Sequence, residues 1–231
     1  MLIKYLLLPA FMAFAFRGDA QHLDYTRYQL LQSGGVAVTN GIESQYEDVQ
    51  GSAFFSDSWL PASVVTEGGT KFTSIHVKLD MYKNRVYMMT HDTLYDLTNA
   101  RILQLVLYNH SAGSDSVVFR RGYGAGGPGP DKFVQVLAAG KLTLLKQQSL
   151  EVKDVHEDGP LSTTKKFIPQ QCYYLARGNG ETQPVKPGRK MLEQEMGPAW
   201  KAVSEHAKDS AWSTNSEEGW SKIIQYYNSL P

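Results

Sequence analysis

The sequence is poor in cysteine, since Cys172 is the only one among 231 residues. A single cysteine cannot close an internal disulfide, so the stability of the chain must come from core packing. Cys172 lies in QQCYYLA, a stretch whose composition is typical of a strand. An unpaired cysteine in such a stretch is usually buried and inert, and a nucleophile is the rarer alternative. We therefore expect Cys172 to be a buried structural thiol.

The chain has no excess of charge of either sign, because 23 Lys and Arg residues balance 23 Asp and Glu residues. A neutral chain offers no basic surface that would attract nucleic acid or an anionic membrane. We therefore expect no nucleic-acid partner. A protein or a glycan remains open as the partner.

A hydrophobic run near the start, Tyr5–Phe16, has only twelve residues, whereas a transmembrane helix needs about 20. The run follows Lys4, and the small residues Gly18 and Ala20 precede Gln21 at the spacing of a signal-peptidase site. This arrangement predicts a secretory signal peptide, with a retained membrane anchor as the alternative. We expect the protein to be exported to the periplasm or the extracellular space, without a transmembrane anchor after cleavage.

Spacings typical of metal sites are missing. The six histidines form neither H-x-H nor H-x-x-x-H, and they are His22, His76, His91, His110, His156 and His206. The densest group of possible ligands runs from Glu151 to Asp158, and its carboxylates and one histidine could hold a divalent ion. A solvated acidic turn is the interpretation that we favour, because charged runs usually face water. We therefore predict no metal ligand.

Catalytic motifs are missing too. The sequence has no G-x-S-x-G nucleophile elbow, and no spacing selects a pair of carboxylates for glycoside hydrolysis. Trp59 and Trp212 could stack on a ligand, but tryptophan more often packs in a core or against a helix. We therefore assign no catalytic and no cofactor-binding residue.

The stretch RRGYGAGGPGPDKF, residues 120–133, comes nearest to a nucleotide-binding motif, since Gly122, Gly124 and Gly127 fit G-x-G-x-x-G. That motif requires a helix that begins at its last glycine, because the helix N-terminus holds the pyrophosphate. Two prolines follow at once instead, and Pro130 stands where a Walker loop needs lysine. The stretch therefore predicts a loop between two strands of a hairpin, and no cofactor is expected.

Short strand patterns are abundant. From Gly51 to about Val155, runs of strand length alternate with turn residues roughly every ten positions. No helix-length periodic segment separates them, which argues against parallel crossover connections. The pattern predicts an antiparallel meander of about eight to ten strands, curved or barrel-like, in which LTLLKQQ and SLEVKDV form successive strands. A further long strand, TKKFIPQQCYYLARG, contains Pro169, which predicts a sheet edge or a bulge.

The end of the chain changes to helical patterns. RKMLEQEM predicts a short helix that ends at Gly197, and PAWKAVSEHAK predicts a second helix with Pro198 in its first turn. In the last helix, Asn215 is the expected cap, and an apolar stripe recurs at i, i+3, i+4 and i+7. The stripe consists of Trp220, Ile223, Ile224 and Tyr227.

These patterns divide the chain into four parts and predict the α+β class. Residues 1–20 form the signal peptide, and residues 21–50 form a segment for which we predict no particular structure. Residues 51–187 form the antiparallel β domain. Residues 188–231 form a helical segment that packs on the sheet.

The run YEDVQGSAFFSDSWLPASVVTEGGTKFTSIHVKLDMYKNRVYMM resembles a pattern that recurs in an uncharacterised family of exported proteins from Bacteroidota. Its marks here are Gly51, Trp59 about eight residues later, and a D-x-Y-x-N turn made by Asp80, Tyr82 and Asn84. FVQVLAAGKLTLLK, CYYLA and a final IIQYYN also fit, whereas the glycine-rich insert departs from the pattern. The resemblance implies one fold and export in a Gram-negative envelope, but no reaction, cofactor or site.

Three functions remain open on these grounds. The first, which we favour, is a non-enzymatic protein of the cell envelope that binds a protein or a glycan. The second is a secreted hydrolase acting on polysaccharide or peptide, which requires a pocket with a pKa-shifted carboxylate or histidine. The third is a periplasmic carrier of a lipid or a metal ion, in which a curved sheet wraps its ligand.

Overall fold

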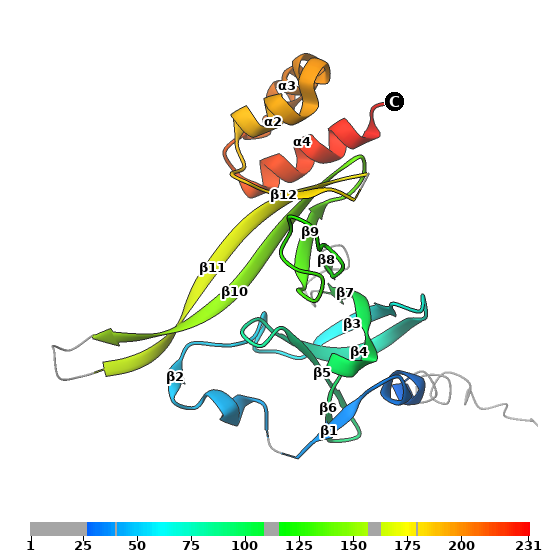
Figure 1. Ribbon diagram of the computed structural model, residues 1–231, viewed down its shortest axis with the longest axis vertical. Helices are drawn as coiled ribbons and strands as arrows, with labels where there is room; N and C mark the ends of the chain where they lie inside the picture. The colour runs from blue at the N-terminus through cyan, green and yellow to red at the C-terminus, as the bar shows by residue number, and fades with distance from the viewer. Residues whose placement is uncertain (1–26, 40, 109–115, 157–162, 179) are drawn as a thin grey trace, which may run out of the picture.

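The computed structural model describes residues 27–39, 41–108, 116–156, 163–178 and 180–231. One sheet of twelve strands forms most of it, and helices α2 to α4 lie at its C-terminal end (Figure 1). The α+β class is therefore confirmed, with more strands than the eight to ten expected. Within the described residues the sheet does not close, because β1 and β12 stand at opposite ends of the strand order.

Most strands follow the predicted runs. Their bounds are β1 (Val36–Val38), β2 (Val49–Gln50), β3 (Leu60–Thr66), β4 (Lys71–Asp80), β5 (Arg85–Thr90), β6 (Thr93–Asp96), β7 (Ile102–Tyr108), β8 (Ser116–Arg120), β9 (Val134–Ala138), β10 (Leu142–His156), β11 (Thr163–Arg177) and β12 (Thr182–Val185). All pairings are antiparallel except that of β2, which runs parallel to β11.

The strand order departs from a strict meander at one place. The order is β1-β6-β5-β4-β3-β7-β8-β9-β10-β11-β12, so β7 returns beside β3 instead of extending from β6. Only Leu97–Arg101 link β6 to β7, and they include the 3-10 turn η2 (Thr98–Ala100). A link this short, part of it helical, cannot cross three strands of a flat sheet. The sheet must therefore curl.

The curled part of the sheet encloses the main hydrophobic core. Apolar side chains that alternate along β3, β4, β5 and β7 point inward, among them Val64, Val77, Met88 and Leu105, all of them fully buried. Residues 27–32 form a helical turn that adds Leu30 to this core. The described part of segment 21–50, for which we predicted no particular structure, thus contributes to the core and supplies β1 and β2.

Strands β10 and β11 form a long hairpin, which we call the arm. The two strands pair over fifteen positions without a register shift, from Leu142 opposite Arg177 to His156 opposite Thr163. The prediction of two successive strands within β10 was wrong, because Ser149 between them starts no turn and the ladder simply continues. Figure 1 shows the arm running from the helices down to the level of β2, which lies beside β11.

Pro169 lies on the outer edge of β11, as predicted for a sheet edge. On this edge β12 pairs with Tyr173–Ala176 and β2 with Lys165–Lys166. Pro169 falls between these two segments, where the structure describes no partner strand. A residue without an N–H therefore costs the sheet no hydrogen bond there.

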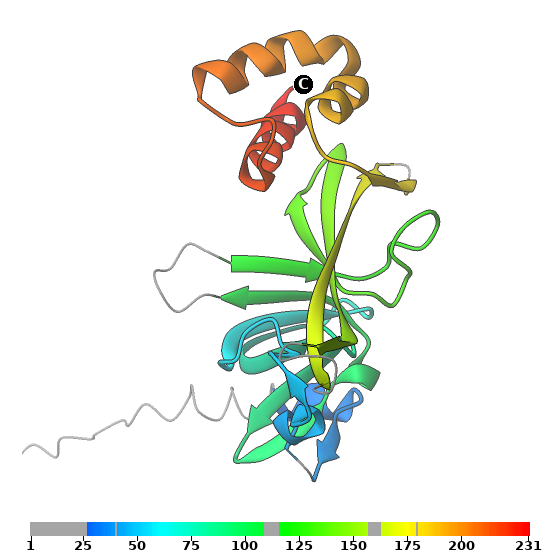
Figure 2. The same cartoon turned by 90° about the vertical axis from the view of Figure 1, so that its left-hand side faces the viewer.

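Helices α2 (Arg189–Met196), α3 (Trp200–Asp209) and α4 (Glu217–Ser229) pack on one end of the sheet (Figure 2). The 3-10 turn η3 (Gly197–Ala199) separates α2 from α3, at the predicted Gly-Pro break. The helices share a second core with the upper arm, formed by Leu144, Leu175, Leu192, Val203, Ile223 and Ile224. The predicted stripe of α4 is therefore confirmed: its two isoleucines are fully buried, and Trp220 and Tyr227 are half-buried beside them.

The predicted cap of α4 was wrong by one residue. Ser216 is the N-cap, and its hydroxyl oxygen accepts a hydrogen bond from the backbone N–H of Gly219 at 3.2 Å. The two residues are neighbours and both are good capping types, so the sequence alone does not separate them.

The predicted signal peptide, residues 1–20, lies outside the described residues. Among the helices that the structure describes, none is both long and apolar enough to cross a membrane.

Candidate functional site

The glycine-rich loop joins two neighbouring antiparallel strands, β8 and β9, as predicted. A bridge between Tyr123 and Gly129 narrows the loop, and no helix begins at Gly127. Gly126 has a positive φ of 69°, and a Cβ there would overlap the carbonyl oxygen of Thr182 in β12. The glycines thus allow the loop to pack tightly against β12, and the helix that a dinucleotide loop requires is absent from this described stretch.

The residues of the D-x-Y-x-N turn organise the link between β4 and β5. Asp80 is fully buried, and its Oδ1 accepts hydrogen bonds from the backbone N–H groups of Tyr82 (2.9 Å) and Lys83 (2.7 Å). Its Oδ2 accepts a hydrogen bond from the hydroxyl of Tyr46 at 2.6 Å. Burial, together with the hydrogen bond to Asp80, raises the pKa of Tyr46 far above its usual range. Both carboxylate oxygens of Asp80 thus accept hydrogen bonds from the protein, and the role of the side chain is structural.

Asn84 ties the same turn to the end of the glycine-rich loop. Its φ of 57° is the left-handed conformation that asparagine tolerates in tight turns. Its amide nitrogen donates to the carbonyl of Asp131 at 2.8 Å, and its amide oxygen accepts from the N–H of Phe133 at 2.9 Å.

An aromatic cluster joins the lower arm to the body of the molecule. It consists of Tyr46, Phe54, Tyr82 and Phe167. The ring of Phe167 in β11 lies edge-on to Tyr46 at 5.5 Å and to Tyr82 at 5.4 Å between centroids. Gly51 has a positive φ of 95°, which favours glycine, and a Cβ there would only reach ordinary contact with the Cβ of Phe167, at 3.7 Å. These aromatic edge contacts add to the area that the rings bury.

Trp59, a candidate for ligand stacking, makes a cation–π contact with a lysine side chain of the protein itself. The ammonium group of Lys78 lies 5.4 Å from the Trp59 ring centroid and 5.0 Å from that of Phe54. Lys78 is buried and is neutralised by an ion pair with Glu43 at 2.6 Å. Three of the five residues that mark the sequence pattern, Gly51, Asp80 and Tyr82, thus lie at the joint between the arm and the body. Trp59 contacts Lys78 beside this joint, and Asn84 ties the β4–β5 turn to the glycine-rich loop.

A cleft of about 370 Å³ opens directly above this joint, and we call it the arm cleft. The body contributes Ser52, Phe54, Phe55 and Met81 to its lining, and the arm contributes Gln148, Ser149, Leu150, Pro169, Gln170 and Gln171. None of these ten side chains is ionisable. The lining therefore combines amides and hydroxyls with aromatic and aliphatic groups, without a formal charge.

The register of the arm explains why the cleft lies there. Gln148 pairs with Gln171 and Leu150 with Pro169, so these four side chains share one face of the arm. Below them on this face, Phe167 is anchored in the aromatic cluster. Above them, Glu217 of α4 accepts a hydrogen bond from the hydroxyl of Tyr173 (2.7 Å) and pairs with Lys146 (2.8 Å). The cleft is the stretch of this face between its two anchors.

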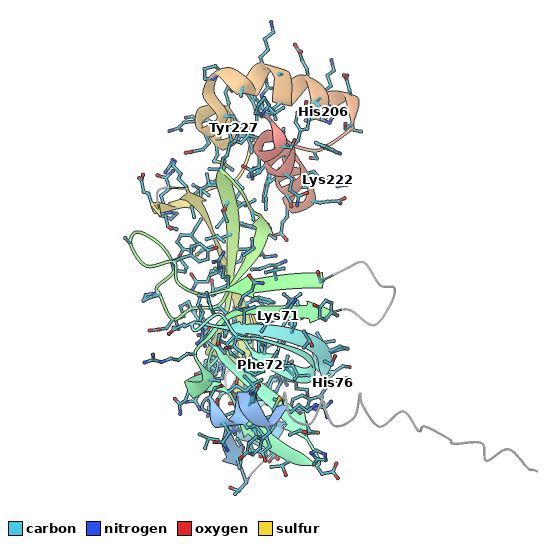
Figure 3. The ribbon with its side chains drawn as sticks, turned by 90° about the vertical axis from the view of Figure 1, so that its right-hand side faces the viewer. Lys71, Phe72, His76, His206, Lys222 and Tyr227 are labelled. Atoms are coloured by element: carbon cyan, nitrogen blue, oxygen red, sulfur yellow. The ribbon has the colours of Figure 1, made fainter. Side chains whose placement is uncertain are left out.

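Several residues singled out from the sequence lie elsewhere. Cys172 is exposed, so the prediction of a buried thiol was wrong. Its side chain lies on the other face of the arm from that of Gln171, and the strand pattern alone does not reveal which face is covered. His76 and His206 lie at opposite ends of the molecule (Figure 3). His206 stacks on Tyr226 at 3.9 Å and lies edge-on to Trp212, so Trp212 docks between helices.

The acidic segment of β10 shows ordinary surface pairing in its described part. Glu151 forms an ion pair with Lys153 at 3.0 Å, while Glu157 and Asp158 lie outside the described residues. Among the residues that the structure describes, no group of three or more His, Cys, Asp or Glu side chains could hold a metal ion.

Comparisons with known proteins add no relative: no protein-family model, no curated protein and no solved structure matches this chain. The resemblance to exported proteins of Bacteroidota stays a prediction.

Sequence reasoning missed the arm cleft, although one signal for it is visible. The pairs QQ at residues 147–148 and 170–171 are unusual for strands, and the register places Gln148 opposite Gln171. Strand composition and turn signals do not reveal that register, so the two pairs could be connected only in the folded chain.

Proposed function

We propose that this protein is a non-enzymatic binding protein of the bacterial envelope and that the arm cleft holds a segment of an uncharged glycan. The observation that carries the proposal is the neutral, mixed lining of the cleft. The amides of Gln148 and Gln171, which share the cleft face of the arm, each offer both donors and an acceptor. This suits hydroxyl groups, which also donate and accept. Phe54, Phe55 and Leu150 supply apolar surface for the C–H faces of a sugar ring.

The chemistry of the lining also favours binding over hydrolysis. General acid–base catalysis needs a titratable side chain within hydrogen-bonding reach of the substrate. The cleft residues include none, and the nearby buried carboxylate of Asp80 is occupied by three donors. A volume of about 370 Å³ lies at the lower end of the range for ligand sites. These observations support a short neutral ligand, with an anionic one disfavoured because no cation lines the cleft.

The prediction of export supports the envelope as the location. The predicted signal peptide at residues 1–20 and the resemblance to exported proteins both favour this location. Expression in a Gram-negative host tests this location. The protein should be found in the growth medium or the periplasmic fraction, and mass measurement should show that the mature chain lacks the signal peptide. A mature chain that still begins at Met1 would contradict export by this route.

Calorimetric titration of the unlabelled protein measures ligand binding directly. A dye on Cys172 is avoided, because this thiol lies on the face of the arm that points away from the cleft. We expect neutral envelope oligosaccharides to give a saturable heat signal, and uronic-acid oligosaccharides to give a weaker one. Uncharged peptides serve as the competing ligand class.

A matched pair of variants tests the site. Gln171→Leu removes one amide from the cleft and should weaken binding roughly threefold to tenfold, because one hydrogen bond contributes about 0.5–1.5 kcal/mol. Gln194→Leu makes the same change at an exposed position of α2 and should leave binding unchanged. Saturable binding of peptides, without binding of glycans, would show that the ligand is a peptide. No saturable signal with any ligand, or equal losses in both variants, would refute the arm cleft as the site.

A further inference from the structure

One edge of the arm is open. Strand β10 pairs with β9 only from Leu144 to Lys146. From Gln147 to His156, the structure describes no strand on the side of β10 that faces away from β11. Figure 1 shows this lower end of the arm projecting from the rest of the molecule, with β2 beside β11.

The hydrogen-bonding groups of this edge can be assigned from the ladder. Leu142 directs both its N–H and its C=O away from β11, to the side chain of Asn228. Because orientation repeats every second residue, Leu150, Val152 and Asp154 direct theirs to the same side. Pro169, which has no N–H, lies opposite Leu150, and this agrees with a pair that exchanges no hydrogen bonds within the arm. An exposed edge with outward donors and acceptors is a template for another strand.

The charges on the edge are complementary to themselves. If two copies of β10 pair antiparallel about a two-fold axis at Val152, Glu151 of each copy lies opposite Lys153 of the other. Leu150 then lies opposite Asp154, and Val152 lies opposite its own counterpart. An axis one residue earlier would place Glu151 against Glu151, and one residue later Lys153 against Lys153. Opposite charges directly across an antiparallel pair stabilise it, and like charges destabilise it.

We propose that the open edge of β10, from Leu150 to Asp154, is a homodimer interface in which a second copy of this chain adds its own β10. The Glu151–Lys153 pairs occupy positions that exchange no hydrogen bonds across the interface, where side chains approach most closely. Both side chains are 54% exposed in the single chain, so they are available to the second copy. The interface is isologous and closes after two copies, which leaves no growing edge.

Charge reversal gives a direct test by analytical ultracentrifugation of the purified protein. Glu151→Lys and Lys153→Glu each convert two attractive cross-strand pairs into repulsive ones, and each should weaken self-association roughly tenfold or more. An equimolar mixture of the two variants should associate again, because one chain then carries only positive and the other only negative charge at these positions. The double variant should dimerise like the parent. Lys201→Glu, at an exposed position of α3 outside the arm, controls for a change in net charge.

The register is tested by cross-linking. Glu151→Cys and Lys153→Cys are each placed in a Cys172→Ser background. Under oxidising conditions a mixture of the two should give a disulfide-linked heterodimer, while each alone should give little linked dimer. A parent protein that stays monomeric at every concentration, or a dimer indifferent to the single charge reversals, would overturn the proposal. Linked dimers formed equally by each cysteine variant alone would overturn the register at Val152. Unchanged circular dichroism of the variants confirms that each one folds.

Discussion

Asp80 is a fully buried carboxylate, and a buried carboxylate is tolerated only when donors replace the water that it loses. Two backbone N–H groups and the Tyr46 hydroxyl do so. Tyr46→Phe removes one of these donors and should lower the free energy of unfolding by about 1.5–3 kcal/mol, the range for hydrogen bonds to charged groups. Tyr82→Phe, in the same aromatic cluster, removes a hydroxyl for which the described residues provide no hydrogen bond and should cost little. Chemical denaturation of both variants measures the difference, and equal losses would contradict this role of Tyr46.

The raised pKa of Tyr46 adds a pH dependence with a definite sign. The hydroxyl ionises in the unfolded chain near its ordinary pKa of 10.0, whereas burial keeps it protonated in the folded protein to higher pH. The folded state therefore holds a proton that the unfolded state has lost, and stability falls as pH rises above 10. We expect the stability gap between the parent and Tyr46→Phe to narrow between pH 9 and pH 11, measured by denaturation at each pH. A gap that stays constant across this window would show that ionisation of Tyr46 is not linked to folding.

At the scale of a single element, α4 depends on its first turn. The helix N-terminus leaves backbone N–H groups without partners, and the Ser216 hydroxyl satisfies that of Gly219. Ser216→Ala should lower the stability by about 1 kcal/mol, whereas Asn215→Ala, one residue outside the cap, should change it by a few tenths at most. Thermal or chemical denaturation distinguishes the two. A larger loss for Asn215→Ala would restore the cap predicted from the sequence.

The strands differ in how well their bounds and their neighbours can be predicted from the sequence. Runs such as KFTSIHVKLD alternate cleanly and end at turn residues, so local chemistry predicts β4 well. The place of β7 beside β3 depends on the curl of the whole sheet, which no local pattern records. The exposure of Cys172 depends on which arm face the body covers. That choice follows from the anchoring of Phe167, a contact more than a hundred residues from Tyr46 in the chain.

At the scale of the molecule, the arm connects the helical core to the aromatic cluster of the body. Leu144 and Leu175 belong to the core shared with the helices, whereas Phe167 belongs to the aromatic cluster at the opposite end. The candidate site lies between these anchors, so its shape depends on both. The sequence predicted β11 and the helices, but it divided β10 into two strands. It could not predict the cleft, because the cleft exists only when the arm is fixed at two places.

Phe167→Ala tests this dependence. The side chain is 6% exposed, and its removal should lower the stability by about 3–5 kcal/mol, as for other buried phenylalanines. The loss should be local at first: amide hydrogen exchange should become faster from Gln148 to Asp154, while Leu144 and Leu175, held by the helices, should stay protected. Ile168→Ala, on the opposite and half-buried face, serves as the control and should perturb exchange less. If protection instead falls uniformly along the arm and into the helical core, the two anchors act as one cooperative unit. In that case the cleft cannot loosen without unfolding the molecule.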